Sequence, residues 1–164
     1  MELTKARAIA EEIKDLLAPV CKKVEIAGSI RRQKPFVRDI DVVLIPTNQG
    51  QLLYRLQQLG QIKSGKAKLI RVEPCKYGIP LDIYVATPET WATLLLIRTG
   101  SARHNIRLCS LARDKGMKLH ADGSGLFRIE AQGCEGVEAR LAGETEESIF
   151  QALEIPYKEP QERE

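Results

Sequence analysis

The sequence lacks long hydrophobic runs, closely spaced cysteines and low-complexity segments, and each absence removes a class of protein. No apolar stretch approaches the roughly 20 residues of a membrane-spanning helix, and charges alternate at the N-terminus where a signal peptide would be apolar. The cysteines are too far apart to begin a Cys-x-x-Cys zinc site; they are Cys21, Cys75, Cys109 and Cys134. We therefore expect reduced thiols, a cytoplasmic (intracellular, reducing) location and no membrane partner.

Histidine is scarce as well. His104 and His120 are the only two in the sequence, and both are more typical of surface or packing residues than of metal ligands. Glycine, proline and serine are scattered, and the 43% hydrophobic and 29% charged residues are ordinary for a folded protein. A chain of 164 residues can bury one sizeable core or two small ones, so a globular enzyme is physically possible. We expect a monomer.

Basic residues, in contrast, are concentrated in three places. The formal net charge is only +3, so local positive charge exceeds what the total suggests. The clusters are Arg31, Arg32, Lys34 and Arg38; Lys63, Lys66, Lys68 and Arg71; and Arg98, Arg103, Arg107, Arg113, Lys115 and Lys118. Such patches suit a polyanionic partner, and solvated surface faces are the other interpretation that the pattern leaves open.

Hydrophobic periodicity divides the chain into a strand-rich half and a helix-rich half. Leu3 to Leu17 reads as an amphipathic helix, and Ile40 to Ile45 and Ile79 to Val85 read as apolar strands covered on both faces. The other expected elements are strands at Val24 to Ala27, within Ile62 to Val72 around Ser64-Gly65, at Met117 to His120 and at Leu126 to Ile129, and helices at Leu52 to Leu59, Glu89 to Arg98, Asn105 to Lys115 and Thr145 to Leu153. We predict an α+β protein with two subdomains, residues 1–87 and 88–164.

Three aspartates are the main candidates for chemistry. Strand alternation places Asp39 and Asp41 on one face of the first apolar strand, and Asp82 lies in the second. If the two strands are neighbours, the three carboxylates converge and repel one another, so positive charge should lie against them. Mg²⁺ prefers such oxygen ligands. A solvated edge or a salt-bridged pair is the alternative for an Asp-x-Asp strand.

A glycine turn upstream strengthens the metal interpretation. Gly28-Ser29 follows a short predicted strand, and glycine lets the backbone approach a phosphate that amide groups at a helix start can bind. Arg31 and Arg32 could add charge-assisted hydrogen bonds. Without the acids, an ordinary Gly-Ser turn with surface arginines would be the simpler interpretation.

These motifs resemble those of a known family in its own order. Gly28-Ser29-Ile30-Arg31-Arg32 followed by Asp39-Ile40-Asp41 and Asp82 is similar to the nucleotidyltransferase palm signature. Thr99-Gly100-Ser101-Ala102-Arg103-His104-Asn105 resembles the thumb motif of the family X DNA polymerases, the polymerase beta-like nucleotidyltransferases, and Thr145 to Phe150 resembles their C-terminal segment. The resemblance implies a palm, with a mixed sheet and helices, followed by a small, mostly helical thumb, in a minimal form without further domains.

The resemblance also implies roles for individual residues. Asp39, Asp41 and Asp82 would hold two Mg²⁺ ions, for which Mn²⁺ may substitute, and Asp82 would help activate the primer 3′-hydroxyl. The implied nucleotide-binding residues are Gly28, Ser29, Arg32, Arg38, Thr99, Gly100, Ser101 and Asn105, and the implied DNA-binding residues are Lys66, Arg98, Arg103 and Arg107. From the residues alone, the Thr-Gly-Ser turn could simply end a helix and Asn105 could be a helix cap.

Several positions depart from the family pattern, two of them around the Thr-Gly-Ser turn. Ile97-Arg98 stands where an aromatic residue usually precedes the Thr-Gly-Ser turn, and Cys109 replaces an arginine that often follows Asn105 by one turn. The function we predict is metal-dependent nucleotidyl transfer from a deoxynucleoside triphosphate to a primer 3′-hydroxyl on gapped or primer-template DNA, filling short gaps during repair. The alternatives are template-independent transfer, transfer to RNA or a small molecule, and a non-catalytic module that bridges DNA ends.

Overall fold

The computed structural model describes residues 1–66, 68–129 and 139–164, with residues 64–66 described by their backbone alone. The chain forms two compact units, Met1–Thr87 and Pro88–Glu164. Helices and a mixed sheet make up the first unit, and the α+β class predicted from the sequence is confirmed. Cys134 lies outside the described residues. Within the described part, no helix has the length and apolar character needed to cross a bilayer.

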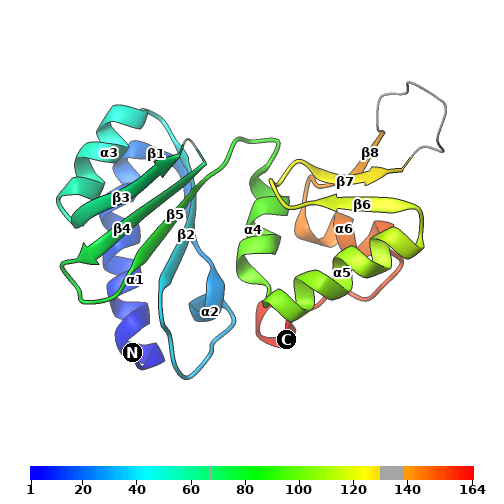
Figure 1. The fold of residues 1–164 in the computed structure, drawn as a ribbon, viewed down its shortest axis with the longest axis horizontal. Helices are drawn as coiled ribbons and strands as arrows, with labels where there is room; N and C mark the ends of the chain where they lie inside the picture. The colour runs from blue at the N-terminus through cyan, green and yellow to red at the C-terminus, as the bar shows by residue number, and fades with distance from the viewer. Residues whose placement is uncertain (67, 130–138) are drawn as a thin grey trace. The chain divides into compact units, whose positions relative to one another are not determined.

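A five-stranded sheet organises the first unit, in the order β1-β2-β5-β4-β3 (Figure 1). Its strands are β1 (Cys21–Ile26), β2 (Ile40–Pro46), β3 (Gly60–Lys66), β4 (Leu69–Cys75) and β5 (Leu81–Val85). Only the β2–β5 pair is parallel. Both apolar strands expected from the sequence are therefore interior strands, which explains why apolar residues occupy both of their faces.

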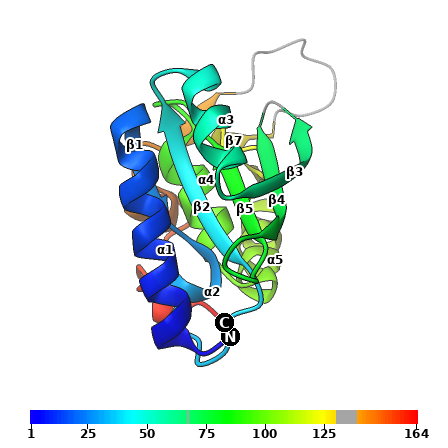
Figure 2. The same cartoon turned by 90° about the vertical axis from the view of Figure 1, so that its left-hand side faces the viewer.

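Helices α1 (Leu3–Leu17) and α3 (Gln49–Gln57) cover one face of this sheet (Figures 1 and 2). The buried stripe of α1, including Ile13 and Leu17, belongs to the same core as alternate residues of β2 and β5. Each fully buried Leu or Ile contributes about 1.5–3 kcal/mol. Because side chains alternate along a strand, packing of this face directs Asp41 and Asp82 to the opposite face.

Two strands form the hairpin between α3 and β5, where the sequence predicts strands within Ile62 to Val72 around Ser64-Gly65. β3 continues through Ser64 and Gly65, and β4 begins at Leu69. Gly60 directly follows the helix predicted at Leu52 to Leu59, but it is the first residue of β3 and pairs with Cys75. A glycine at a helix end and a glycine at a strand start look alike in sequence, and only the pairing partner distinguishes them.

The second unit packs three helices and a small antiparallel sheet around its own core. Its elements are α4 (Trp91–Thr99), α5 (Ala102–Asp114), β6 (Met117–His120), β7 (Gly125–Arg128), β8 (Arg140–Ala142) and α6 (Glu146–Ala152). Short 3-10 helices at Ala18–Val20 and Pro160–Glu162 complete the described elements of the chain. The short strand β8 was not predicted, because three residues carry too little periodicity to be recognised.

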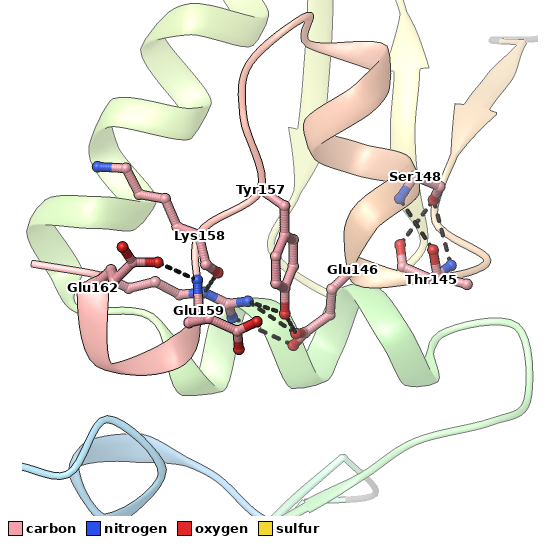
Figure 3. A network of polar contacts seen from close by, with 8 residues as sticks. Thr145, Glu146, Ser148, Tyr157, Lys158, Glu159 and Glu162 are labelled. Carbon is pink, nitrogen blue, oxygen red and sulfur yellow. Dashed lines mark hydrogen bonds and ion pairs between the residues drawn. The ribbon is translucent and has the colours of Figure 1, made fainter.

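A buried arginine ties down the segment that follows α6. Arg163 is fully buried; its Nη2 donates to Glu146 Oε2 at 3.0 Å and to Tyr157 Oη at 3.0 Å, and its Nε donates to Lys158 O at 3.0 Å. Figure 3 shows Tyr157 and Glu146 pointing toward one another, and their oxygens are 3.3 Å apart. Thr145 caps α6 by accepting a hydrogen bond from Ser148 N. The network fixes the last residues against α6.

Candidate functional site

Two of the three predicted acids lie side by side on neighbouring strands. β2 and β5 run parallel with Asp41 opposite Asp82, on strands that lie about 4.8 Å apart in such a sheet. Asp39 precedes β2 by one residue, in a bend rather than in the strand itself. The structure thus brings together the carboxylates of Asp41 and Asp82, and the charge of Asp39 is near enough to affect Asp41.

The Asp41 carboxyl is in an unfavourable electrostatic position. Burial raises its pKa to about 7, and the negative charges of Asp39 and Asp82 add to the increase. A hydrogen bond with Tyr84 and the charge of Arg32 oppose it without cancelling it. A cation placed between these carboxylates would stabilise the ionised form.

Arg71 is the direct partner of Asp82. It lies opposite Asp82 on β4, and its Nη1 is 3.3 Å from Asp82 Oδ2, while its Nε is 3.2 Å from Glu73 Oε2. The charge of Asp82 is the main reason that the pKa of Arg71 is raised. From the sequence, Arg71 was assigned to a basic cluster that would bind a polyanion outside the protein. Neither Arg71 nor Tyr84 was recognised as part of this site, because both belong to it only through strand register.

The residues are compatible with a divalent cation in their chemistry and charge. Among the described residues, no group of three or more acidic, histidine or cysteine side chains is gathered as metal ligands are. Asp41 and Asp82 nevertheless supply hard oxygen donors from adjacent strands. The pKa of Asp41 is raised first by burial and then by the neighbouring negative charges, and a cation would offset both. The role of the three acids as ligands remains a prediction.

The Gly28 turn is built around Asp41. Gly28 has a φ of +58°, and a Cβ on it would lie only 1.9 Å from Asp41 Oδ2. The amide of Ala27 donates to the carbonyl of Asp41 at 2.8 Å, so backbone and carboxylate are held together. Gly28 and Ser29 begin the single-turn helix α2 (Gly28–Arg31), and Ser29 Oγ is buried with no hydrogen-bond partner among the described residues.

Two predicted phosphate-binding arginines flank this turn differently. Arg32 ends α2, and burial lowers the pKa of its guanidinium while the charges of Asp41 and Asp39 oppose that shift. Arg38 is exposed and immediately precedes Asp39. Positive charge therefore lies on both chain segments that lead into the acids.

The Thr99-Gly100-Ser101 turn joins α4 to α5. Thr99 is buried at the end of α4, and Ser101 caps α5 by accepting a hydrogen bond from His104 N at 3.0 Å. Asn105 Nδ2 donates to Ile97 O at 2.8 Å, and a Cβ on Gly100 would lie 2.5 Å from Asn105 Oδ1. The cap of α5 is therefore Ser101, and Asn105 links the two helices.

The predicted DNA-binding residues are exposed to different degrees. Arg103 and Arg107 are exposed one turn apart on α5, with Arg107 Nη1 3.4 Å from the carbonyl oxygen of Glu164. Arg98 is half-buried in the last turn of α4. Lys66 is the last residue of β3, and only its backbone belongs to the described part of the chain.

Comparison with known proteins supports the resemblance that the sequence motifs show. Residues 94–164 match the family described as DNA polymerase beta thumb. The chain is 29% identical to DNA polymerase/3′-5′ exonuclease PolX of Bacillus subtilis over 120 residues, covering 70% of this chain and 21% of that protein. It is 41% identical to DNA polymerase lambda of Rattus norvegicus over 86 residues, covering 51% of this chain and 15% of that protein.

The fold has a counterpart among solved structures. A Leishmania infantum polymerase beta in a ternary P/T complex matches with a TM-score of 0.79 and 20% identity, covering 100% of this chain and 76% of that one. Fold and thumb match together define a polymerase-beta-type nucleotidyltransferase architecture. These matches support a relationship of the chain to the family X DNA polymerases. It spans about a fifth or less of the length of the two curated relatives named above.

Proposed function

We propose that this chain transfers a nucleotidyl group from a deoxynucleoside triphosphate to the 3′-hydroxyl of a DNA primer, filling short gaps during repair. The proposal depends on one observation: Asp41 and Asp82 lie opposite each other on neighbouring strands, and Gly28 packs directly against the Asp41 carboxylate. This arrangement concentrates negative charge beside a turn suited to a phosphate. Such a combination is hard to explain unless a cation accompanies the phosphate.

The proposed reaction is an in-line displacement at the α-phosphorus. The primer 3′-oxygen forms the new phosphorus–oxygen bond, the bond to the bridging oxygen of pyrophosphate breaks, and the hydroxyl loses its proton. Asp39, Asp41 and Asp82 would hold Mg²⁺ or Mn²⁺, which when bound neutralises charge on the attacking and leaving oxygens. Asp82, kept in place by Arg71, would help activate the 3′-hydroxyl.

The remaining roles follow the chemistry of each turn. Ser29 Oγ and the Arg32 guanidinium would bind triphosphate oxygens, as would the backbone amide of Arg38. In the second unit, the Thr99-Gly100-Ser101 turn would contact the nucleotide sugar, and Asn105, held by Ile97 O, would present its amide to the base. Exposed Arg103 and Arg107 would follow the DNA backbone, together with Lys66 and Arg98.

A gapped-primer extension assay tests the proposal. The purified chain is given a one-nucleotide gap and each deoxynucleotide in turn, first with Mg²⁺ and then with Mn²⁺. We expect extension by the complementary nucleotide, dependence on the metal, and a steep fall in activity with added salt because phosphate contacts release counterions. Asp82→Asn should remove the activity while the variant stays folded. Retained extension by that variant would contradict the assignment.

The same assay separates the other candidate functions. Extension of a single strand with any of the nucleotides would indicate template-independent transfer. Preference for an RNA or small-molecule acceptor would show that the acceptor is not a DNA primer. DNA binding without any metal-dependent turnover would indicate an end-bridging module. The close packing of Gly28 on Asp41 favours the catalytic proposal, because a purely binding surface gains nothing from a half-buried carboxylate beside the polyanion.

A further inference from the structure

Phe36 is the most exposed large hydrophobic side chain among the described residues. It is 73% exposed, whereas its neighbour Val37 is only 1% exposed. Single exposed apolar residues are common on protein surfaces and need no explanation by themselves. Phe36 differs because the backbone on either side of it is fixed, so the ring is held outward rather than left to fold back.

A short antiparallel bridge fixes this backbone. Leu3 N donates to Pro35 O at 3.0 Å, and Val37 N donates to Met1 O at 2.8 Å, on either side of the bridge between Glu2 and Phe36. Strand alternation then buries Val37 and turns Phe36 to the surface. The ring is presented rigidly by a segment that the protein has tied to the start of α1.

The preceding turn is equally constrained. Gln33 has a φ of 59°, its amide donates to Ile30 O at 3.0 Å, and Lys34 N donates to Ser29 O at 3.0 Å. The segment bearing Phe36 is therefore hydrogen-bonded directly to the Gly28-Ser29 turn. It also leads through Arg38 into Asp39 and β2.

We propose that Phe36 is a stacking platform for an unpaired nucleobase of a single-stranded DNA segment next to the gap, with Lys34 and Arg38 near the strand's phosphates. This inference rests on the proposed function and adds a contact for the DNA strand. An exposed aromatic ring among cationic side chains is the combination that binds single strands without sequence preference, since every base offers a flat face. The adjacent Gly28-Ser29 turn places the platform beside the proposed phosphate site.

Glu2 provides an internal check on this charge argument. The hydrogen bonds flanking the bridge make Glu2 and Phe36 a non-hydrogen-bonded pair, whose side chains lie close together on one face. The Glu2 carboxylate should therefore repel the phosphates of a strand stacked on Phe36. Glu2→Gln should strengthen binding of single-stranded DNA by up to a few-fold.

The test measures DNA binding separately from chemistry. A fluorescently labelled single-stranded oligonucleotide is titrated with the full chain, without divalent metal or nucleotide, over a range of salt concentrations. Phe36→Ala should weaken binding by about 5- to 100-fold, and Phe36→Trp should restore it. Tyr54→Ala removes an aromatic side chain that is 66% exposed on α3 and is the matched control, with an expected change below about twofold.

Salt dependence distinguishes stacking from charge. Phe36→Ala should lower affinity equally at every salt concentration, because stacking releases no counterions, whereas Arg38→Ala should reduce the slope by about one unit. The fluorescence of a 2-aminopurine base in the oligonucleotide should be quenched when the wild type binds it. The quenching should be weaker when the Phe36→Ala variant binds.

The outcomes separate the two proposals. If Phe36→Ala binds DNA like the wild type, or loses no more affinity than Tyr54→Ala, the proposed stacking platform is wrong even if gap filling is intact. A protein contact would then be the remaining role for the exposed ring. If the wild type neither binds DNA nor extends a primer, the proposed function itself has failed.

Discussion

Two carboxylates, the buried Glu146 and the half-buried Asp41, are in opposite situations, one in each unit. Glu146 is 7% exposed and is met by the fully buried Arg163, with Tyr157 donating to the same carboxylate. Asp41 instead faces two other carboxylates, and its pKa is raised to about 7. The charge of Glu146 is balanced within the protein and holds the C-terminal segment in place. That of Asp41 is balanced only in part, by a hydrogen bond with Tyr84 and the charge of Arg32.

The difference shows how a structural charge can be told from a functional one. A buried ion pair needs its partner and its hydrogen bonds, and Glu146 has both. A half-buried carboxyl beside two like charges lowers stability, so its presence calls for a functional explanation. Structural ion pairs also shift pKa values, and Arg71 with Asp82 shows that both situations can occur in one site.

The largest expected effect comes from Asp41→Asn. Loss of the carboxylate should lower the rate of gap filling by at least about 10³-fold, because charge stabilisation by a bound metal supplies several kcal/mol. Stability should be unchanged or higher, because the substitution removes a repelled charge. Primer extension and thermal unfolding of the same preparation measure the two effects. A clear loss of stability would show that Asp41 is a structural charge like Glu146.

Arg163→Met should have the opposite profile. It leaves Glu146 buried without its cation, which costs about 3–5 kcal/mol in the free energy of unfolding. Urea unfolding measures the loss. The double variant with Glu146→Gln should recover part of it, since no charge is then left unpaired, and the double-mutant cycle gives the coupling. Additive losses would mean that the pair does not act as a unit.

The sequence predicted the elements that carry their own periodicity. The apolar stripe of α1 and the continuous apolar runs of β2 and β5 all form where expected, within a few residues. The thumb motif likewise identified the turn at Gly100. These features are local, so they can be read from a single chain.

The rest depends on pairing between distant segments. That Asp41 lies opposite Asp82, and Arg71 opposite Asp82, is a matter of strand register, which no single strand specifies by itself. The same holds for Tyr84, which reaches Asp41 from β5. The partner of Glu146 was likewise out of reach, because Arg163 follows it by 17 residues and approaches through an irregular segment.

Gly28→Ala should separate backbone strain from damage to the acid site. Its Cβ would collide with Asp41 Oδ2, so the carboxylate must move and activity should fall by about 100-fold. Gly78→Ala is the matched control: Gly78 also has a positive φ, +71°, but nothing lies within 4 Å of the new Cβ. It should cost about 1–2 kcal/mol in stability and leave activity intact. Equal activities of the two variants would show that Asp41 tolerates displacement.

The smallest expected effect tests the charge balance of the second unit through His104. Its ring is buried, with its centroid 5.9 Å from that of Phe150, and its pKa is lowered to about 4, first by burial and then by the charges of Arg163 and Lys158. The unfolded chain therefore takes up a proton near pH 6.5, before the folded chain does. Stability from this residue is complete above that pH and is lost as the pH falls toward 4, by at most about 3 kcal/mol.

His104→Phe keeps a ring against Phe150 and removes the titration, so its free energy of unfolding should fall less than that of the wild type between pH 7 and pH 4.5. Urea unfolding at several pH values measures the difference, and subtraction cancels the contribution of every group that the two proteins share. Parallel pH profiles would mean that His104 accepts its proton in the folded state. The positive charges of Arg163 and Lys158 would then tolerate one more cation beside them, and the charge of the second unit would be less closely balanced than its hydrogen bonds suggest.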